Sequence, residues 1–127
     1  MKTKFTYVGI RVEDMQKSID FYTKLLGMKV VSKHQIEQTR GMIVNLKSEN
    51  SNFILELNYY EADSPYNTEY VGGEGLDHLA FAVDDLDKAL EESKMSGYPK
   101  ILEIKTKKMR WAYIEDPNGI WIELFSE

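Results

Sequence analysis

Apolar residues recur along this chain first with the period of a strand and then with that of a helix. Over residues 5–12 they alternate, as in a half-buried strand. A helix is expected next, because Asp14 suits the position before its first turn and Gly27 suits its end. Its predicted apolar stripe is Met15, Ile19, Tyr22, Leu25 and Leu26. Strand candidates follow at residues 29–34, 41–47 and 52–59, giving the order β-α-β-β-β.

The second half of the chain repeats this order in a shorter form. A strand is predicted at residues 76–83, followed by a helix that begins after Asp85 and ends at Gly97. The residues expected on the apolar face of that helix are Leu86, Ala89, Leu90 and Ser93. The last strand candidates are residues 100–104, 110–115 and 120–125, with a hairpin turn at residues 116–119.

We therefore expect an α+β fold made of two βαβββ modules within a single domain, residues 1–127. Module one is predicted at about residues 1–62 and module two at about residues 76–127. The polar, glycine-containing residues 63–75 are predicted to link them.

The repeat extends from the order of the elements to the residues themselves. Residues 7–15 (Y-V-G-I-R-V-E-D-M) align with residues 78–86 (H-L-A-F-A-V-D-D-L), and residues 54–57 (I-L-E-L) align with residues 121–124 (W-I-E-L). Tyr7 therefore aligns with His78, and Glu56 with Glu123. Because side chains alternate across a strand, these polar residues share the face opposite the apolar one. The apolar face is predicted to hold Val8, Ile10, Val12, Phe53, Leu55, Leu57, Leu79, Phe81, Val83, Ile122 and Leu124.

The neighbours on the polar face suit a ligand pocket better than a solvated surface. Gly9, Ala80 and Ala82 are small and leave space, while Trp121 and Phe125 offer apolar walls. If the sheet curls, the four polar groups of the repeat are expected to meet inside the curve.

The repeated polar residues suit a metal site. A lone strand glutamate is usually solvated and a lone histidine is usually structural, but matched positions on one face favour a metal or catalytic role for Glu56, His78 and Glu123. Tyr7 is a candidate fourth ligand, with hydrogen bonding to a metal-bound water or lining of the pocket as alternatives. Two carboxylates and an imidazole without sulfur suit Zn²⁺, Ni²⁺, Co²⁺, Mn²⁺ or Fe²⁺. Glu56 or Glu123 is also a candidate general base beside such an ion.

Composition narrows the function classes further. The chain has 127 residues, 43% hydrophobic and 29% charged, with a net charge of −5 and no cysteine. These values exclude thiolate sites and argue against nucleic acid or membrane as partner; with no apolar leader, a cytoplasmic location is expected. The basic residues Lys105, Lys107, Lys108 and Arg110 form either a solvated strand edge or, with Arg11, a site for an anionic substrate.

Several blocks of the sequence resemble one enzyme family. Residues 13–29 (E-D-M-Q-K-S-I-D-F-Y-T-K-L-L-G-M-K), 55–59 (L-E-L-N-Y), 75–85 (G-L-D-H-L-A-F-A-V-D-D) and 115–124 (E-D-P-N-G-I-W-I-E-L) are similar to blocks of bacterial glyoxalase I. This family, the lactoylglutathione lyases, belongs to the vicinal oxygen chelate superfamily. The resemblance implies a curved eight-stranded mixed sheet, usually in a homodimer with sites at the subunit interface.

The resemblance also implies roles for individual residues. Glu56, His78 and Glu123 match three of the family's four metal ligands, whereas Tyr7 stands where the family has a histidine, which predicts weaker or altered metal binding. Arg11 matches an arginine that approaches the carboxylate of the thiol cofactor. The family's glutathione-holding asparagine is replaced by Tyr60, and Asn58 lies nearby on the metal-facing side.

The expected function is therefore a metal-dependent carbon–sulfur lyase. It would convert the hemithioacetal of methylglyoxal and a thiol, such as glutathione, into a 2-hydroxyacyl thioester, with Ni²⁺ or Zn²⁺ as the expected metal. Glu123 is expected to move the proton, and Glu56 to assist as the opposing base. Two alternatives stay open: another metalloenzyme of the superfamily, such as an epimerase or dioxygenase, and a metal-free binding or resistance protein.

Overall fold

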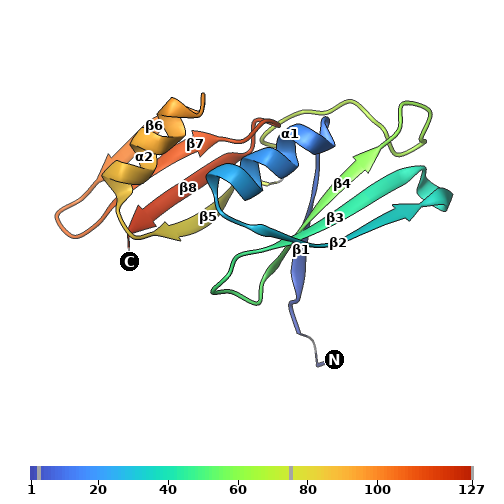
Figure 1. Ribbon diagram of the computed structural model, residues 1–127, viewed down its shortest axis with the longest axis horizontal. Coiled ribbons are helices and arrows are strands. Elements are labelled where there is room, and N and C mark those ends of the chain that lie inside the picture. Colours follow the sequence, from blue (N-terminus) through green and yellow to red (C-terminus); the bar gives the residue numbers. More distant parts are fainter. Residues whose placement is uncertain (3, 75, 127) are drawn as a thin grey trace. The chain divides into compact units, whose positions relative to one another are not determined.

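Each half of the chain folds into a strand, a helix and three further strands (Figure 1). The computed structural model describes residues 1–2, 4–74 and 76–126, and it divides into the units Met1–Tyr70 and Val71–Glu127. The first unit contains β1 (Tyr7–Arg11), α1 (Met15–Asp20), η1 (Phe21–Leu25), β2 (Lys29–Ile36), η2 (Glu37–Thr39), β3 (Gly41–Lys47) and β4 (Ile54–Tyr60). The second contains β5 (His78–Val83), α2 (Leu86–Met95), β6 (Leu102–Lys105), β7 (Arg110–Glu115) and β8 (Trp121–Ser126).

The sheet of the first unit has the strand order β1-β4-β3-β2. β1 and β4 run parallel, with Gly9 opposite Glu56, and the other neighbours are antiparallel. Helix α1 packs against β4. The buried apolar residues of this unit are Ile10, Val12, Phe21, Tyr22, Met28, Val44, Leu46, Leu55 and Leu57.

The first helix begins as predicted but buries a different stripe. The Asp14 side chain accepts a hydrogen bond from the backbone N–H of Lys17, and Gly27 has a φ of 70°. The chain then widens into the π-helical turn η1, where the N–H of Leu26 donates to the carbonyl of Phe21 at 3.2 Å. The buried residues of the helical segment are Ser18 in α1, and Phe21 and Tyr22 in η1. Of the predicted stripe, Tyr22 is buried, whereas Met15, Ile19, Leu25 and Leu26 are half-buried.

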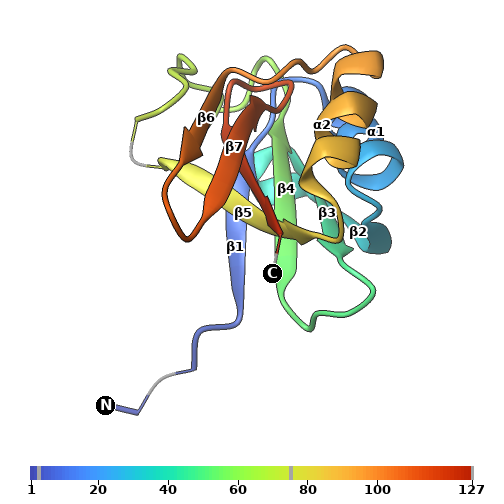
Figure 2. The ribbon, with the colours of Figure 1, turned by 90° about the vertical axis from the view of Figure 1, so that its left-hand side faces the viewer.

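The sheet of the second unit has the matching order β5-β8-β7-β6 (Figure 1), and Figure 2 shows β6 beside β7. β5 and β8 run parallel, with Ala80 opposite Glu123, and β7 runs antiparallel to β8, with Tyr113 opposite Glu123. Helix α2 packs against β8, and the side chain of Asp85 caps it as predicted by accepting from the N–H of Lys88. The buried apolar residues here are Leu86, Ala112, Tyr113, Ile114, Ile120, Ile122 and Leu124.

The fold class predicted from the sequence is confirmed: each unit is a βαβββ module, and the eight strands form two four-stranded mixed sheets. The division of the strands into two faces is confirmed for most positions. Phe53 is the exception, because it precedes β4 and is 46% exposed. Within the predicted linker, Gly75 lies outside the described residues. In the described part of the chain, every helix is too short or too polar to cross a membrane.

The turn between β7 and β8 holds the second sheet in register. The buried carboxylate of Asp116 accepts hydrogen bonds from the backbone N–H groups of Asn118 at 2.7 Å and Ile120 at 2.9 Å. Its other oxygen accepts from the side-chain amide of Asn118 at 3.0 Å. Gly119 completes the turn with a φ of 78°. This turn sets the pairing that places Tyr113 opposite Glu123.

We predict that Asp116→Ala lowers the free energy of unfolding by about 3 kcal/mol, because it leaves buried N–H groups without their charged acceptor. Chemical denaturation followed by circular dichroism measures this loss. The control Asp84→Ala removes an exposed carboxylate and should change stability by no more than about 0.5 kcal/mol. Equal stability of the two variants would contradict the role given to the turn.

Candidate functional site

Two of the predicted ligands are in direct contact within the second unit. His78 lies at the start of β5 and Glu123 lies on β8, and the Nε2 atom of His78 is 3.1 Å from Oε2 of Glu123. The His78 side chain is 34% exposed and that of Glu123 is 21% exposed, so both are accessible to a small ligand. The small Ala80, opposite Glu123 in the sheet, leaves room beside the carboxylate.

The other ring nitrogen of His78 also faces a carboxylate. Its Nδ1 atom is 2.6 Å from Oδ1 of Asp77, the preceding residue. A neutral imidazole carries one N–H and one lone pair, so it can donate to only one of these two carboxylates. A neutral ring that donates from Nδ1 to Asp77 presents a lone pair at Nε2 toward Glu123. Donation from Nδ1 to a carboxylate is the arrangement found behind metal-binding histidines.

Glu123 is also held from the neighbouring strand. The hydroxyl of Tyr113 lies 3.2 Å from Oε2 of Glu123, and the indole Nε1 of Trp111 lies 3.2 Å from the same hydroxyl. The Tyr113 ring contacts those of His78 and Trp121, with centroids 5.5 and 5.3 Å away. Burial raises the pKa of the Tyr113 phenol, and the negative charge of Glu123 raises it further. Tyr113 is therefore a neutral hydrogen-bond donor near neutral pH.

The first unit carries the matching pair on β1 and β4. Glu56 is half-buried and pairs across the sheet with Gly9, where a Cβ atom would lie 3.6 Å from Oε1 of Glu56 and 3.1 Å from Nδ2 of Asn58. Gly9 thus leaves space in front of both polar side chains. Tyr7 lies on the same face of β1 and is 51% exposed; within the described residues its hydroxyl has no hydrogen-bond partner.

Arg11 lies at the end of β1 and is held by the segment that follows β4. Its guanidinium donates to the hydroxyl and to the backbone carbonyl of Thr68, both at 2.8 Å, and lies 5.1 Å from the centre of the Tyr70 ring. These residues border a hollow of about 260 Å³. Its other lining residues are Val12, Glu13, Tyr59, Tyr60, Ala62 and Asn67.

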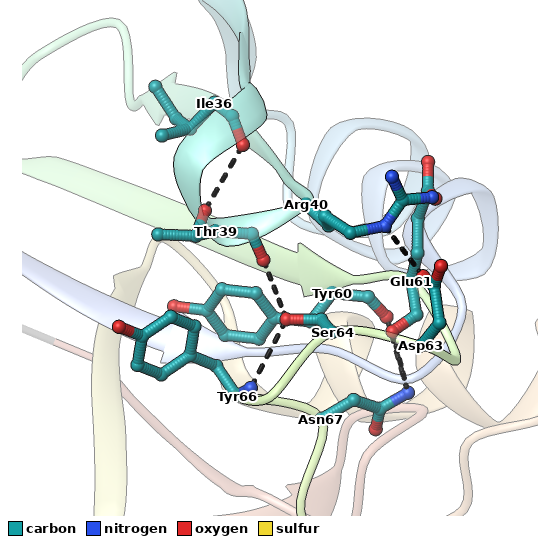
Figure 3. Close-up of polar contacts among 9 residues, drawn as sticks. All are labelled: Ile36, Thr39, Arg40, Tyr60, Glu61, Asp63, Ser64, Tyr66 and Asn67. Carbon is teal, nitrogen blue, oxygen red and sulfur yellow. Dashed lines mark hydrogen bonds and ion pairs between the residues drawn. The ribbon is translucent and has the colours of Figure 1, made fainter.

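Polar contacts attach this segment to the turn after β2 (Figure 3). The hydroxyl of Ser64 donates to the carbonyl of Thr39 at 2.6 Å and accepts from the N–H of Tyr66 at 3.1 Å. Arg40 binds Asp63 at 2.7 Å and Glu61 at 2.6 Å. The segment therefore belongs structurally to the first unit and carries Thr68 to Arg11.

The basic residues Arg110 and Lys107 of the second unit differ in their surroundings. Arg110 donates to Asp87 at 2.6 Å and also binds Glu103. Hydrogen bonding to Asp87 and then Glu103 raises the pKa of Arg110. Arg110 lowers the pKa of Asp87, whereas hydrogen bonds from Lys100 and then Arg110 lower the pKa of Glu103. Lys107 is exposed. Arg110 therefore serves the fold, and Lys107 is the residue of this predicted pair that is open to an anion.

Each unit thus holds half of the predicted ligand set: Tyr7 and Glu56 in the first, His78 and Glu123 in the second. Among the residues that the structure describes, no three histidine, aspartate or glutamate side chains form a cluster suited to a metal ion. The four-ligand site stays a prediction. Two further residues of the site, Asp77 and Tyr113, were not predicted from the sequence. Asp77 directly precedes His78, and the length of the β7–β8 turn was the signal that could have placed Tyr113 beside Glu123.

The sequence was compared with protein families and with individual proteins. A family model described as "Glyoxalase/Bleomycin resistance protein/Dioxygenase superfamily" matches residues 4–124. The chain belongs to this superfamily. This confirms the resemblance deduced from the sequence blocks.

Several individual proteins that resemble this chain are named lactoylglutathione lyases. The chain is 32% identical to the Escherichia coli O157:H7 lactoylglutathione lyase, over 98% of this chain and 93% of that protein. It is 36% identical to a probable chloroplastic lactoylglutathione lyase of Arabidopsis thaliana over 97% of its length. The chain spans only 35% to 44% of the length of that protein and of two other plant relatives.

A solved structure shows the same fold. The trypanothione-dependent glyoxalase I of Leishmania major superimposes on 99% of this chain and 88% of its own, with a TM-score of 0.79 and 29% sequence identity.

Proposed function

We propose that this protein is a metal-dependent lyase of the glyoxalase I type. Its substrate is the hemithioacetal of a 2-oxoaldehyde, such as methylglyoxal, and a thiol, and its product is the 2-hydroxyacyl thioester. The observation that carries the proposal is the 3.1 Å contact between Nε2 of His78 and Oε2 of Glu123. Similarity to proteins named lactoylglutathione lyase supports the same chemistry.

The donor atoms fit a divalent ion. Nε2 of His78 and Oε2 of Glu123 lie 3.1 Å apart, so these two atoms would hold the ion as its nitrogen and oxygen donors. Asp77 accepts from Nδ1 of His78, which leaves the Nε2 lone pair for the ion. An imidazole with carboxylate oxygens suits Zn²⁺ or Ni²⁺.

Glu56 and Tyr7 are proposed to complete the ligand set. The sequence repeat aligns Glu56 with Glu123 and Tyr7 with His78, and Gly9 keeps the face beside Glu56 open. A neutral phenol is a poor ligand compared with imidazole, so the Tyr7 position is the weak corner of the site.

Glu123 is proposed to carry the proton during the reaction. A bound divalent ion supplies positive charge that acidifies the carbon next to a carbonyl group. The C–H bond of the hemithioacetal carbon breaks as Glu123 accepts the proton, and Glu123 returns it to the adjacent carbon. The hydroxyl proton of the hemithioacetal carbon passes to the neighbouring ketone oxygen, so the first carbon becomes the thioester carbonyl and the second becomes the alcohol. Glu56 acts as the opposing base. The reaction is an isomerisation, because atoms are neither gained nor lost.

The thiol cofactor is proposed to bind beside Arg11. The hollow of about 260 Å³ combines a guanidinium with tyrosine rings and the amide of Asn67, which suits a flexible thiol with a carboxylate, such as glutathione. Asn58 lies two residues after Glu56 on β4, so both side chains are on the same polar face of the sheet. Lys107 remains the second candidate for binding an anionic group, since Arg110 is engaged by Asp87 and Glu103.

The proposal predicts bound metal and metal-dependent turnover. Protein purified without chelator should contain a divalent metal and isomerise the methylglyoxal–glutathione hemithioacetal, with stimulation by Ni²⁺ or Zn²⁺. Glu123→Gln should lower kcat by roughly 10²- to 10⁴-fold, because it removes the base. The affinity for the metal should fall by a smaller factor than kcat. The control Glu91→Gln changes an exposed carboxylate on α2 and should have no effect. The proposal fails if no metal binds and added metal produces no turnover with any thiol.

Replacing Tyr7 with histidine tests whether position 7 is a metal ligand. Tyr7→His should tighten Ni²⁺ or Zn²⁺ binding by at least about tenfold, or ~1.4 kcal/mol, because imidazole is the better donor. Isothermal titration of the metal measures the difference. Tyr66→His, an equally exposed position, serves as the control. Unchanged affinity in Tyr7→His would show that position 7 does not face the ion.

A further inference from the structure

The hydrogen bonds around Tyr113 have a fixed direction. The indole N–H of Trp111 can only donate, so the Tyr113 hydroxyl accepts at this 3.2 Å contact. The hydroxyl proton is then directed to Oε2 of Glu123, 3.2 Å away, since an ionised carboxylate only accepts. The chain of donation therefore runs from Trp111 to Tyr113 to Glu123.

The two oxygens of Glu123 differ in their surroundings. Oε2 accepts the hydrogen bond from the hydroxyl of Tyr113 and lies 3.1 Å from Nε2 of His78. Oε1 has no hydrogen-bond partner within the described part of the chain. One oxygen is thus held by the protein, while the other is free to meet a substrate proton.

We infer that Tyr113 is a positioning residue for the base: Trp111 orients its hydroxyl, the hydroxyl holds one oxygen of Glu123, and the other oxygen carries the proton. This inference rests on the proposed function, and it adds Tyr113 and Trp111 as the residues that orient the base Glu123. A base must lie within hydrogen-bonding reach of the proton that it takes, so a carboxylate free to rotate would spend less time in the reactive position.

The sheet gives Tyr113 a rigid platform for this role. Tyr113 is 9% exposed and lies directly opposite Glu123 in the β7–β8 pair. Its ring contacts His78 and Trp121, and a phenylalanine ring would keep these contacts. Tyr113→Phe therefore removes the hydroxyl and preserves the packing, which separates positioning from a purely structural role.

The test compares Tyr113→Phe with unmodified protein, with Tyr66→Phe as a matched control at an exposed position. Tyr113→Phe should lower kcat with methylglyoxal–glutathione hemithioacetal by roughly 10- to 100-fold, leave KM nearly unchanged and weaken Ni²⁺ binding by about tenfold. The primary isotope effect with substrate deuterated at the transferred position should increase, because proton transfer becomes slower. Trp111→Phe should shift the same quantities in the same direction by a smaller factor.

The outcomes separate this inference from the function on which it rests. If unmodified protein turns over with metal, and Tyr113→Phe and Trp111→Phe both match it in kcat, isotope effect and Ni²⁺ affinity, the inference is overturned and the function stands. If unmodified protein shows no metal-dependent turnover, both are overturned. A lower kcat and a higher KM, together with a lower melting temperature and an unchanged isotope effect, would assign Tyr113 to structure alone.

Discussion

One imidazole placed between two carboxylates constrains the rest of the site. His78 contacts Asp77 through Nδ1 at 2.6 Å and Glu123 through Nε2 at 3.1 Å. A neutral ring donates to only one of these carboxylates. In the proposed function, His78 and Glu123 would instead both be ligands of one divalent ion, with Nε2 and a carboxylate oxygen as the donor atoms. The contact therefore explains why a histidine and a glutamate lie together on a half-exposed sheet face.

The β-sheet fixes this contact through its register. The parallel pairing of β5 with β8 and the antiparallel pairing of β7 with β8 leave Glu123 between Ala80 and Tyr113. The small neighbour gives space and the large one gives a hydrogen bond. The Asp116 turn holds the β7–β8 register, so the buried carboxylate of Asp116 in the turn supports the position of the half-buried Glu123 on β8. On the first unit, the pairing of Gly9 with Glu56 provides the same combination of open space and carboxylate.

The patterns that are local in sequence predicted the fold well. Alternation identified the strands, Asp14 and Asp85 marked the helix starts, and the repeat gave two βαβββ modules. The stripe predicted for the first helix is buried or half-buried, but it left out the buried Ser18 and Phe21. Phe53 was wrongly assigned to the apolar face because β4 begins at Ile54, two residues after the predicted start.

For the site, the sequence identified the residues but not their partners. The repeat picked out His78 and Glu123, whose contact depends on strand pairing across the sheet. It missed Tyr113, because a hydroxyl becomes relevant only when the hairpin register is known. Arg11 was chosen for its charge, but its bonds to Thr68 join residues far apart in sequence, which no periodicity reveals.

X-ray absorption spectroscopy of the Ni²⁺-loaded protein tests the central claim most directly, because it reports the atoms bound to the metal. The account predicts a shell of nitrogen and oxygen donors that includes a single imidazole. That imidazole signal should vanish in His78→Ala and persist in His34→Ala, the other histidine of the chain. A shell without imidazole, or one that loses its imidazole in His34→Ala, would contradict the account.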